Sequence, residues 1–321
     1  MDIKEKIRGV YCGWFFGPGA TLRRPLGTNY RAMKQNPEWA RVSSFEEIPS
    51  DYKMYDQLTQ TQIVHDILIK HGEISPELFR DRFLELNKRD DILNNNQYGP
   101  SSQKSVQNLL SGASPHETGK DGVTTGAAMR CMPVGVYFRN DLNKLIHNTG
   151  ESCIISHNSD VAINSAIAVT TMIAGLLNNL ESKDSLEQTL QVLAENYNKR
   201  GESTSFARID QRIKDAVAWI QGLDFESATQ TIAERVGYSW YAIEGIPAGF
   251  ALYFATKDAK EAALMAFKAG SNHTAPEIAC ALHGAEKGSE IFPKEIIRKI
   301  EEANNFSIDK MVEGMIKATT D

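Results

Sequence analysis

The sequence predicts an all-α protein, and three observations lead to that prediction. Apolar residues recur at the three- and four-residue spacing of amphipathic helices along nearly the whole chain. No run of alternating β-branched residues bounded by hairpin turns occurs. Small residues are frequent in the most apolar segments, which allows neighbouring helices to approach closely. Because no linker or break in composition divides the chain, we expect one compact domain over residues 1–321.

The periodicity marks the helices in chain order. Apolar stripes predict helices over residues 3–14, 63–68, 186–194 and 209–220. The longest apolar stretch is Val161–Leu177, and four polar residues interrupt it: Asn164, Ser165, Thr170 and Thr171. These polar residues argue against a membrane span. We therefore expect a buried helix near the centre of the fold.

The amino-acid composition limits which classes of binding partner are expected. The chain has 35 basic and 41 acidic residues and a net charge of −6, so a basic surface for nucleic acid is not expected. The N-terminal residues lack the apolar core of a signal peptide. The four cysteines form no CxxC pair, which favours reduced thiols over zinc or disulfide chemistry. We expect a cytoplasmic protein with no nucleic-acid or membrane partner.

The segment 124–135 carries the strongest local signal. Thr124, Thr125 and Gly126 form a small-residue turn whose backbone N–H groups are suited to an anion. A short apolar helix is expected next, ended by Pro133 and Gly135. Arg130 lies among apolar residues, so its charge needs a partner, and a neighbouring carboxylate is the ordinary one.

The segment Thr124–Gly135 resembles the Gly-Asn-Gly-Ala-Ala-Met-Arg-x-x-Pro-x-Gly motif of the ADP-ribosylglycohydrolase family. Other segments are similar to that family's motifs in the same order: Arg8–Gly17, Tyr98–Gly112, Ser156–Asn158, Ala269–Thr274 and Ala281–Gly288. The likeness covers nearly all 321 residues. It implies an all-α fold and hydrolysis of a ribosyl or ADP-ribosyl bond.

The family's acidic motifs are altered here. Its Thr-Asp-Asp-Thr and Asp-Thr-Asp-Thr loops hold two Mg²⁺ ions, and they match residues 56–59 and 271–274. In this chain those aspartates are replaced, at the four positions Gln57, Leu58, Ser271 and His273. Magnesium prefers carboxylate oxygens. We therefore expect no metal cofactor, although the family implies magnesium.

Each altered loop leads into a capping-box pattern. Thr59–Gln62 and Thr274–Glu277 both have the form Ser/Thr-x-x-Glu/Gln, which predicts helix caps at Thr59 and Thr274. Asp56 and His273 then belong to the entering loops. Since a carboxylate and an imidazole together can transfer protons near neutral pH, we take Asp56 and His273 as the catalytic candidates.

The remaining candidates would bind substrate. The resemblance brings them to one cleft from four loops: Gly99, Ser101, Ser102, Thr124, Thr125, Gly126, His157, Ser271 and Asn272. Their expected partner is a small ribosyl or ADP-ribosyl ligand. Two other acids compete with Asp56 for a functional role: Asp160 at a helix start and Glu244 in an apolar run.

Two functional classes remain open. The first is a hydrolase that cleaves a ribosyl- or glycosyl-type bond without the magnesium pair. An N-glycosidic bond is the expected target. The second is a non-catalytic binding or structural protein on the same scaffold, for which the jellyfish lens crystallins that resemble the family are a precedent. The polar replacements Ser271, Asn272 and His273 favour the first reading, and Leu58 favours the second.

Overall fold

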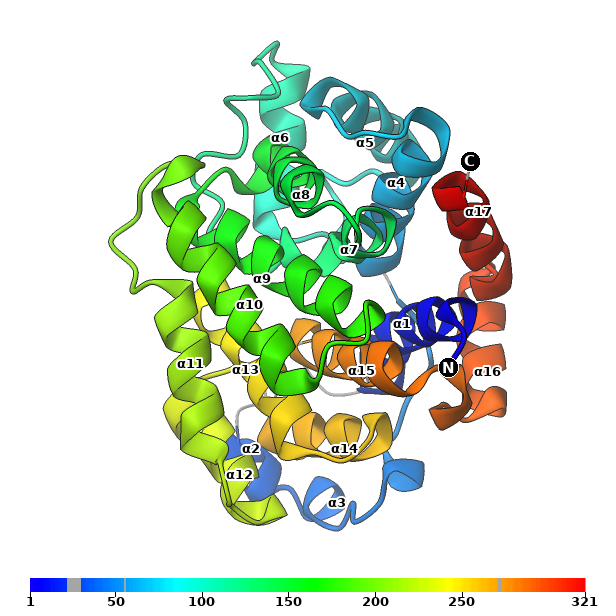
Figure 1. Cartoon of the computed structure of the whole chain (residues 1–321), viewed down its shortest axis with the longest axis vertical. Helices are drawn as coiled ribbons and strands as arrows, with labels where there is room; N and C mark the ends of the chain where they lie inside the picture. The colour runs from blue at the N-terminus through cyan, green and yellow to red at the C-terminus, as the bar shows by residue number, and fades with distance from the viewer. Residues whose placement is uncertain (22–29, 55, 271–272, 321) are drawn as a thin grey trace. The chain divides into compact units, whose positions relative to one another are not determined.

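The computed structural model describes residues 1–21, 30–54, 56–270 and 273–320. Within these ranges the regular secondary structure is helical, and no β-strand occurs (Figure 1). The predicted all-α fold is confirmed. Its helical character follows from the pervasive three- and four-residue apolar spacing.

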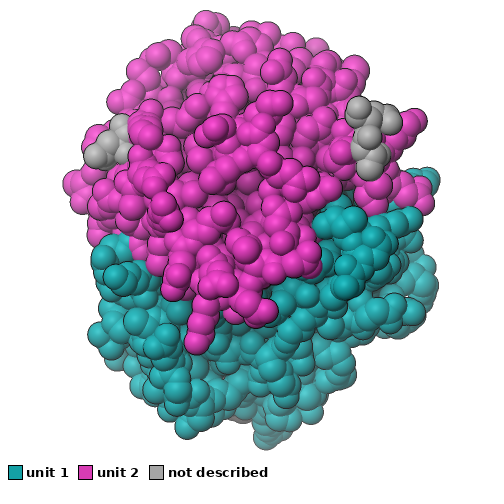
Figure 2. All heavy atoms as spheres, in the orientation of Figure 1, with its two compact units in different colours: residues 1–54, 211–312 teal, residues 55–210, 313–321 magenta. Residues whose placement is uncertain are grey.

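The contacts group the chain into two compact units. Unit 1 comprises residues 1–54 and 211–312, and unit 2 comprises residues 55–210 and 313–321 (Figure 2). Two helices, α11 (Ile209–Ile220) and α17 (Ile308–Thr320), contain residues of both units. The extent of a single domain over 1–321 stays a prediction.

Unit 1 is built around a central pair of helices, α1 and α15. Its helices and helical turns are α1 (Ile3–Thr21), α2 (Tyr30–Gln35), α3 (Pro37–Ala40), η1 (Phe45–Glu47), α12 (Phe225–Thr231), the π-turn η4 (Ile232–Val236), α13 (Ala242–Ala255), α14 (Ala259–Ala269), α15 (Thr274–Lys287), η5 (Ser289–Ile291) and α16 (Lys294–Asn304). Helices α13 and α14 both pack on α15 (Figure 1).

Helices α1 and α15 are in backbone contact along one glycine-lined face. Gly9, Gly13 and Gly17 recur every four residues and so share a face of α1. A Cβ atom at Gly13 would overlap the carbonyl oxygen of Cys280, and one at Gly9 would overlap that of Gly284. Because no side chain fits between the backbones, these glycines set the distance between the two helices.

We expect Gly13→Ala to destabilise the protein by about 2 to 3 kcal/mol, since overpacking against a rigid backbone forces the helices apart. Urea unfolding at pH 7 measures the change. Gly314→Ala in α17 is the matched control, because its Cβ would lie 3.6 Å or more from its neighbours. The control should be neutral or slightly stabilising. Equal losses in the two variants would contradict the backbone-contact explanation.

Unit 2 surrounds one long helix, α9. Its helices and helical turns are α4 (Asp56–His71), α5 (Pro76–Asp90), α6 (Pro100–Leu110), the 3₁₀ turn η2 (Ala128–Arg130), α7 (Met132–Tyr137), α8 (Leu142–His157), α9 (Asp160–Leu177), α10 (Ser182–Asn196) and η3 (Tyr197–Lys199). Helices α7, α8 and α10 pack directly on α9 (Figure 1).

Every residue of α9 is buried, as the sequence predicted for Val161–Leu177. Within the described part of the chain, α9 alone is both long enough and apolar enough to cross a membrane. Three of its polar side chains, Asn164, Ser165 and Thr170, donate hydrogen bonds inside the protein, whereas the hydroxyl of Thr171 is buried without a partner among the described residues. Asn164 donates to the carbonyl oxygens of Asp160 at 2.8 Å and Tyr197 at 3.1 Å, and Thr170 donates to the carbonyl of Ala166 at 3.0 Å. These bonds offset the cost of burying the polar groups.

The predicted start of α4 is wrong, and that of α15 is one residue away. Helix α4 begins at Asp56, so Thr59 lies in its first turn and donates to the carbonyl of Asp56. His273 is the cap of α15, and Thr274 is its first helical residue. The position of Pro133 is also corrected, because it lies in the first turn of α7 and helps to begin that helix.

Candidate functional site

Asp56 lies where two helix N-termini meet. It is the first residue of α4, and its carboxylate accepts the backbone N–H of Gly99, the residue that caps α6. It also accepts the N–H of Gln57 and its own N–H. The positive ends of the two helices therefore face one carboxyl group. This arrangement pairs an anion with backbone donors from separate segments of unit 2.

The environment of Asp56 tunes its proton affinity. Burial raises its pKa to about 7, against the opposing effects of the N–H donors and the positive charge of Arg130. The side chain nevertheless keeps partial exposure. A carboxyl group with a pKa near 7 is partly protonated and partly ionised at neutral pH. Such a group can both give and take a proton there.

Arg130 is fully buried, and neutral groups bind it within unit 2. Its Nη1 donates to Gln60 Oε1 at 2.7 Å, and its Nη2 donates to Ser156 Oγ at 2.8 Å. Its Nε donates to the carbonyl oxygen of Ser152 at 3.1 Å, near the C-terminal end of α8. The guanidinium carbon lies 4.8 Å from the ring centre of Phe79. The bonded neutral acceptors replace the carboxylate partner that the sequence suggested.

His157 is buried with both ring nitrogens engaged. Its Nδ1 lies 2.7 Å from Ser156 Oγ, and its Nε2 lies 2.8 Å from Thr124 Oγ1. Burial, followed by the charge of Arg130, holds the pKa of His157 well below its ordinary value. The imidazole is therefore neutral at physiological pH. Hydrogen bonds therefore connect the side chains of Arg130, Ser156, His157 and Thr124 in that order.

Three glycines allow the 119–126 loop to pack closely against the C-terminal end of α8. A Cβ at Gly119 would overlap the backbone of Ile154, and one at Gly122 would overlap the backbone of Ser156. A Cβ at Gly126 would lie 2.6 Å from Cε1 of His157. The loop therefore fixes the His157 ring from the side of Thr124. Sequence reasoning missed Gly119 and Gly122, although their spacing before Gly126 was visible.

The structure places six of the candidate binding residues in two segments of unit 2, the start of α6 and the 124–126 turn. Gly99 is exposed, with open space at its Cβ position, while Ser101 is half-buried in the first turn of α6. Ser102 is buried, and its hydroxyl accepts from Gln60 Nε2 at 3.3 Å. The other three candidates form the 124–126 turn, where Thr124 and Gly126 are half-buried and Thr125 is buried. The Gln60 side chain connects Ser102 to Arg130, because it contacts both residues.

The other candidates belong to unit 1. His273 is half-buried at the start of α15, and its ring centre lies 5.6 Å from that of Trp240, an exposed residue. Ser271 and Asn272 lie outside the described residues. The convergence of His273 with Asp56 stays a prediction.

The competing acids have local structural partners. Asp160 accepts the N–H and the hydroxyl of Thr204, at 3.0 and 2.7 Å. Glu244 accepts the N–H of Ser239 at 3.2 Å and lies against Gly237. These contacts hold loops onto helix starts. Asp56 is thus the acid whose position and raised pKa best suit chemistry.

The residues around Asp56 do not fit a magnesium pair. Leu58 is apolar and buried, and Gln57 presents an amide where the family has a carboxylate. The oxygens of Asp56 already accept backbone N–H groups. Among the residues that the structure describes, no group of three histidine, cysteine or acidic side chains is arranged to hold a metal ion. Magnesium favours at least one or two carboxylates, so this donor set is poorly matched to it.

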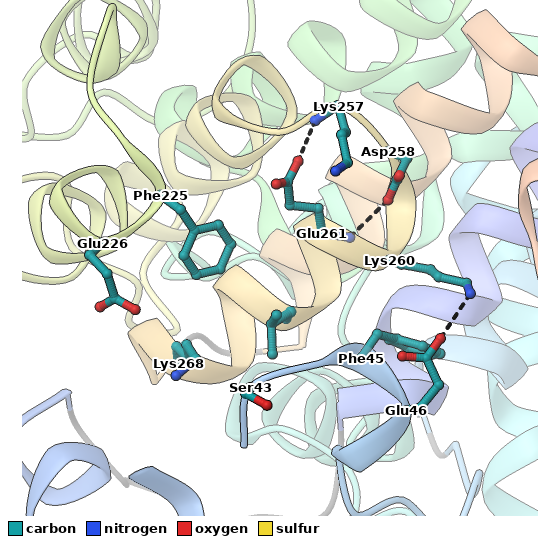
Figure 3. A pocket seen from close by; sticks show the side chains of 11 residues that line it. Ser43, Phe45, Glu46, Phe225, Glu226, Lys257, Asp258, Lys260, Glu261 and Lys268 are labelled. Atoms are coloured by element: carbon teal, nitrogen blue, oxygen red, sulfur yellow. Dashed lines mark hydrogen bonds and ion pairs between the residues drawn. The ribbon is translucent and has the colours of Figure 1, made fainter. Parts of the chain in front are cut away.

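A surface pocket of about 490 Å³ lies elsewhere, in unit 1 (Figure 3). Three of its four acids make local contacts: Glu46 pairs with Lys260 at 2.9 Å, Asp258 accepts the N–H of Glu261, and Glu261 accepts the N–H of Lys257. None of the candidate residues lines it. These groups serve as a helix cap and an ion pair, which leaves the Asp56 region as the better candidate site.

Comparisons with known proteins agree with the resemblance of the motifs. The chain is 30% identical over 301 residues to an uncharacterized protein of Archaeoglobus fulgidus, covering 90% of this chain and 89% of that protein. It is 26% identical over 255 residues to the uncharacterized protein YegU of Escherichia coli, covering 78% and 76% of the two chains. A solved structure titled "ADP-ribosylglycohydrolase-related protein complex" has the same fold, with a TM-score of 0.67, 15% identity and coverage of 98% and 99%.

The match to a family profile extends across the chain. The profile described as ADP-ribosylglycohydrolase matches residues 2–320. This match confirms the family that the segment Thr124–Gly135 suggested. The chain belongs to the ADP-ribosylglycohydrolase family.

Proposed function

We propose that this protein is a glycoside hydrolase that cleaves an N-glycosidic ribosyl bond of an ADP-ribosyl-type compound without a magnesium pair. Membership of a hydrolytic family supports a glycohydrolase. The observation that carries the metal-free mechanism is the carboxyl group of Asp56, a half-buried residue at two helix N-termini, whose pKa is raised by burial to about 7. No other described acid combines these properties.

The proposed reaction needs charge stabilisation and an activated water. Cleavage of an N-glycosidic bond builds positive charge on the anomeric carbon and ring oxygen. Ionised Asp56 would stabilise that charge and accept a proton from the attacking water. The water oxygen then bonds to the anomeric carbon while the bond to the leaving nitrogen breaks. The leaving group takes a proton from an acid, the role we assign to His273.

Two segments of unit 2 suit the rest of the ligand. Gly99 presents an exposed backbone at the start of α6, and Ser101 lies in the first turn of the same helix. Thr124 and Gly126 offer a second polar edge. Helix N-termini and small polar residues favour phosphate and hydroxyl oxygens. A diphosphate or sugar is therefore the expected ligand class.

Metal independence is the direct test of this proposal. We expect hydrolysis of ADP-ribosyl or simple ribosyl compounds to persist in EDTA, and millimolar Mg²⁺ to leave the melting temperature within about a degree at constant ionic strength. Product release by chromatography and a thermal melt measure the two effects. Activity that is abolished by EDTA and restored by Mg²⁺, or a rise of several degrees, would overturn the metal-free mechanism.

A non-catalytic role is the second candidate, and two observations favour it. Leu58 is a buried apolar residue beside Asp56, and His157 uses both ring nitrogens within the protein. If the protein binds ADP-ribose but hydrolyses none of the compounds offered, the binding role replaces the hydrolase.

A further inference from the structure

The hydrogen bonds of His157 determine the direction of a buried chain of donors and acceptors. Ser156 Oγ lies 2.7 Å from Nδ1, and Thr124 Oγ1 lies 2.8 Å from Nε2. A neutral imidazole carries one N–H, so one of these contacts uses the ring as a donor and the other uses it as an acceptor. The geometry of the pair alone leaves both assignments open.

Arg130 removes the ambiguity. A guanidinium group only donates, and Nη2 of Arg130 lies 2.8 Å from Ser156 Oγ. The serine oxygen therefore accepts from Arg130. Among the described residues, Nδ1 of His157 is the one acceptor within reach of the serine hydroxyl proton, so that proton points to Nδ1. Nδ1 is then the acceptor and Nε2 carries the proton. The ring donates that proton to Thr124 Oγ1.

Thr124 is the end of this chain that a ligand can reach. Arg130, Ser156 and His157 are buried, whereas Thr124 is half-buried at the start of the 124–126 turn. Because Thr124 Oγ1 accepts from His157, the threonine hydroxyl proton is directed to a different acceptor. Neighbouring glycines hold the ring in place, since a Cβ at Gly126 would contact it at 2.6 Å.

We infer that Arg130, Ser156 and His157 are positioning residues that make Thr124 a hydrogen-bond donor to an acceptor oxygen of the ligand. His157 acts through Thr124 and does not itself contact the ligand. The identity of that ligand, an ADP-ribosyl group, rests on the proposed function. The fixed donor direction favours phosphate, carbonyl or ring oxygens over groups that can only donate.

The orientation of the chain can be tested in the unaltered protein without a ligand. Nitrogen NMR of protein labelled with ¹⁵N-histidine distinguishes the two neutral tautomers of each ring. We expect the His157 ring to be protonated at Nε2 and bare at Nδ1 at pH 7. In Ser156→Ala, Nδ1 loses its donor, and we expect the proton to redistribute between the ring nitrogens. An unaltered protein protonated at Nδ1 would overturn the inference.

The effect on recognition is tested with ADP-ribose as the probe, by calorimetry. We expect Ser156→Ala to weaken binding about tenfold, the effect of losing one well-directed hydrogen bond. Ser152→Ala is the matched control, because it removes a buried hydroxyl one turn earlier on α8 that bonds to the carbonyl of Thr149 at 2.7 Å. The control should bind as the unaltered protein does.

A second pair of variants tests the same hydrogen bond from outside α8, so that a local disturbance of α8 by Ser156→Ala cannot explain the result. Thr124→Val removes the hydroxyl at nearly constant volume and should weaken ADP-ribose binding about tenfold. Thr124→Ser keeps the donor and should retain most of the affinity. If Ser156→Ala and Thr124→Val bind as tightly as the unaltered protein, the positioning role is wrong and the proposed ligand stands. If the unaltered protein binds no ADP-ribose, the proposed function fails, and the NMR result still decides the orientation.

Discussion

Asp56→Asn is expected to make the protein more stable and less active. If Asp56 is the proton-transferring carboxyl group, its amide analogue should lower turnover about 100-fold or more. The asparagine oxygen can still accept the N–H groups of Gly99 and Gln57, so the helix ends keep their cap. The variant should therefore remain folded. Initial rates on a compound that the unaltered protein hydrolyses measure the loss.

The gain in stability follows from the raised pKa of Asp56. In the unfolded chain this carboxyl group has its ordinary pKa of 3.8, and in the folded protein its pKa is about 7. Well below pH 3.8 both states are protonated, so the group has no net effect, and at pH 4 its effect is small. As pH rises from 4 to 7 the unfolded state ionises first, and the folded state is progressively destabilised. The penalty is complete above pH 7.

The size of this effect must allow for the partial exposure of Asp56. A three-unit shift corresponds to about 4 kcal/mol, and solvent screening reduces it to about 1 to 2 kcal/mol. We therefore expect Asp56→Asn to match the unaltered protein at pH 4 and to exceed it by that amount at pH 8 in urea unfolding. A variant that is less stable at pH 8 would show that the ionised carboxylate is a favourable helix cap.

His273 offers a parallel test of the proposed acid. His273→Ala should also lower turnover about 100-fold or more, because the leaving group then lacks its proton donor. Normal turnover in His273→Ala would exclude this residue from the mechanism and leave Asp56 as the one described candidate.

The sequence predicted the elements that depend on local pattern. Helix α9 was predicted because a long apolar stretch with few polar interruptions suits a fully buried helix in an all-α protein. The close approach of α1 and α15 agrees with the small residues seen in both segments. The start of α4 was not predicted, because the capping-box pattern at Thr59–Gln62 also occurs inside helices. The helix begins three residues earlier, at Asp56.

The properties of the site depend on contacts between distant segments. Arg130 was expected to meet a carboxylate, but Gln60 and Ser156, which come from other helices, bind it. The raised pKa of Asp56 requires burial by the fold and a donor from Gly99, and neither can be read from the residues around position 56. Local pattern thus identified the segments of the site, whereas the folded structure determines their protonation and hydrogen bonding.

Arg130→Met is expected to cause the largest loss of stability, about 3 to 4 kcal/mol. The substitution keeps a long apolar side chain but leaves Gln60 Oε1, Ser156 Oγ and two carbonyl oxygens of α8 without their donor. Buried acceptors that lose their partners carry the full cost of desolvation. Urea unfolding at pH 7 measures the change. Arg139→Met is the matched control, because Arg139 is half-buried and donates to one carbonyl, that of Val136, at 3.2 Å.

A lysine at position 130 separates the charge from the geometry. Arg130→Lys keeps the positive charge near Asp56 but cannot reach all the acceptors that the planar guanidinium serves. We expect a loss of about 2 kcal/mol, between those of Arg130→Met and Arg139→Met. Because the charge remains, the pH range over which Asp56 affects stability should stay in place, whereas Arg130→Met should move it upward. If Arg130→Met costs no more than Arg139→Met, the buried network contributes little to the fold, and its role would then lie with Thr124 and the ligand alone.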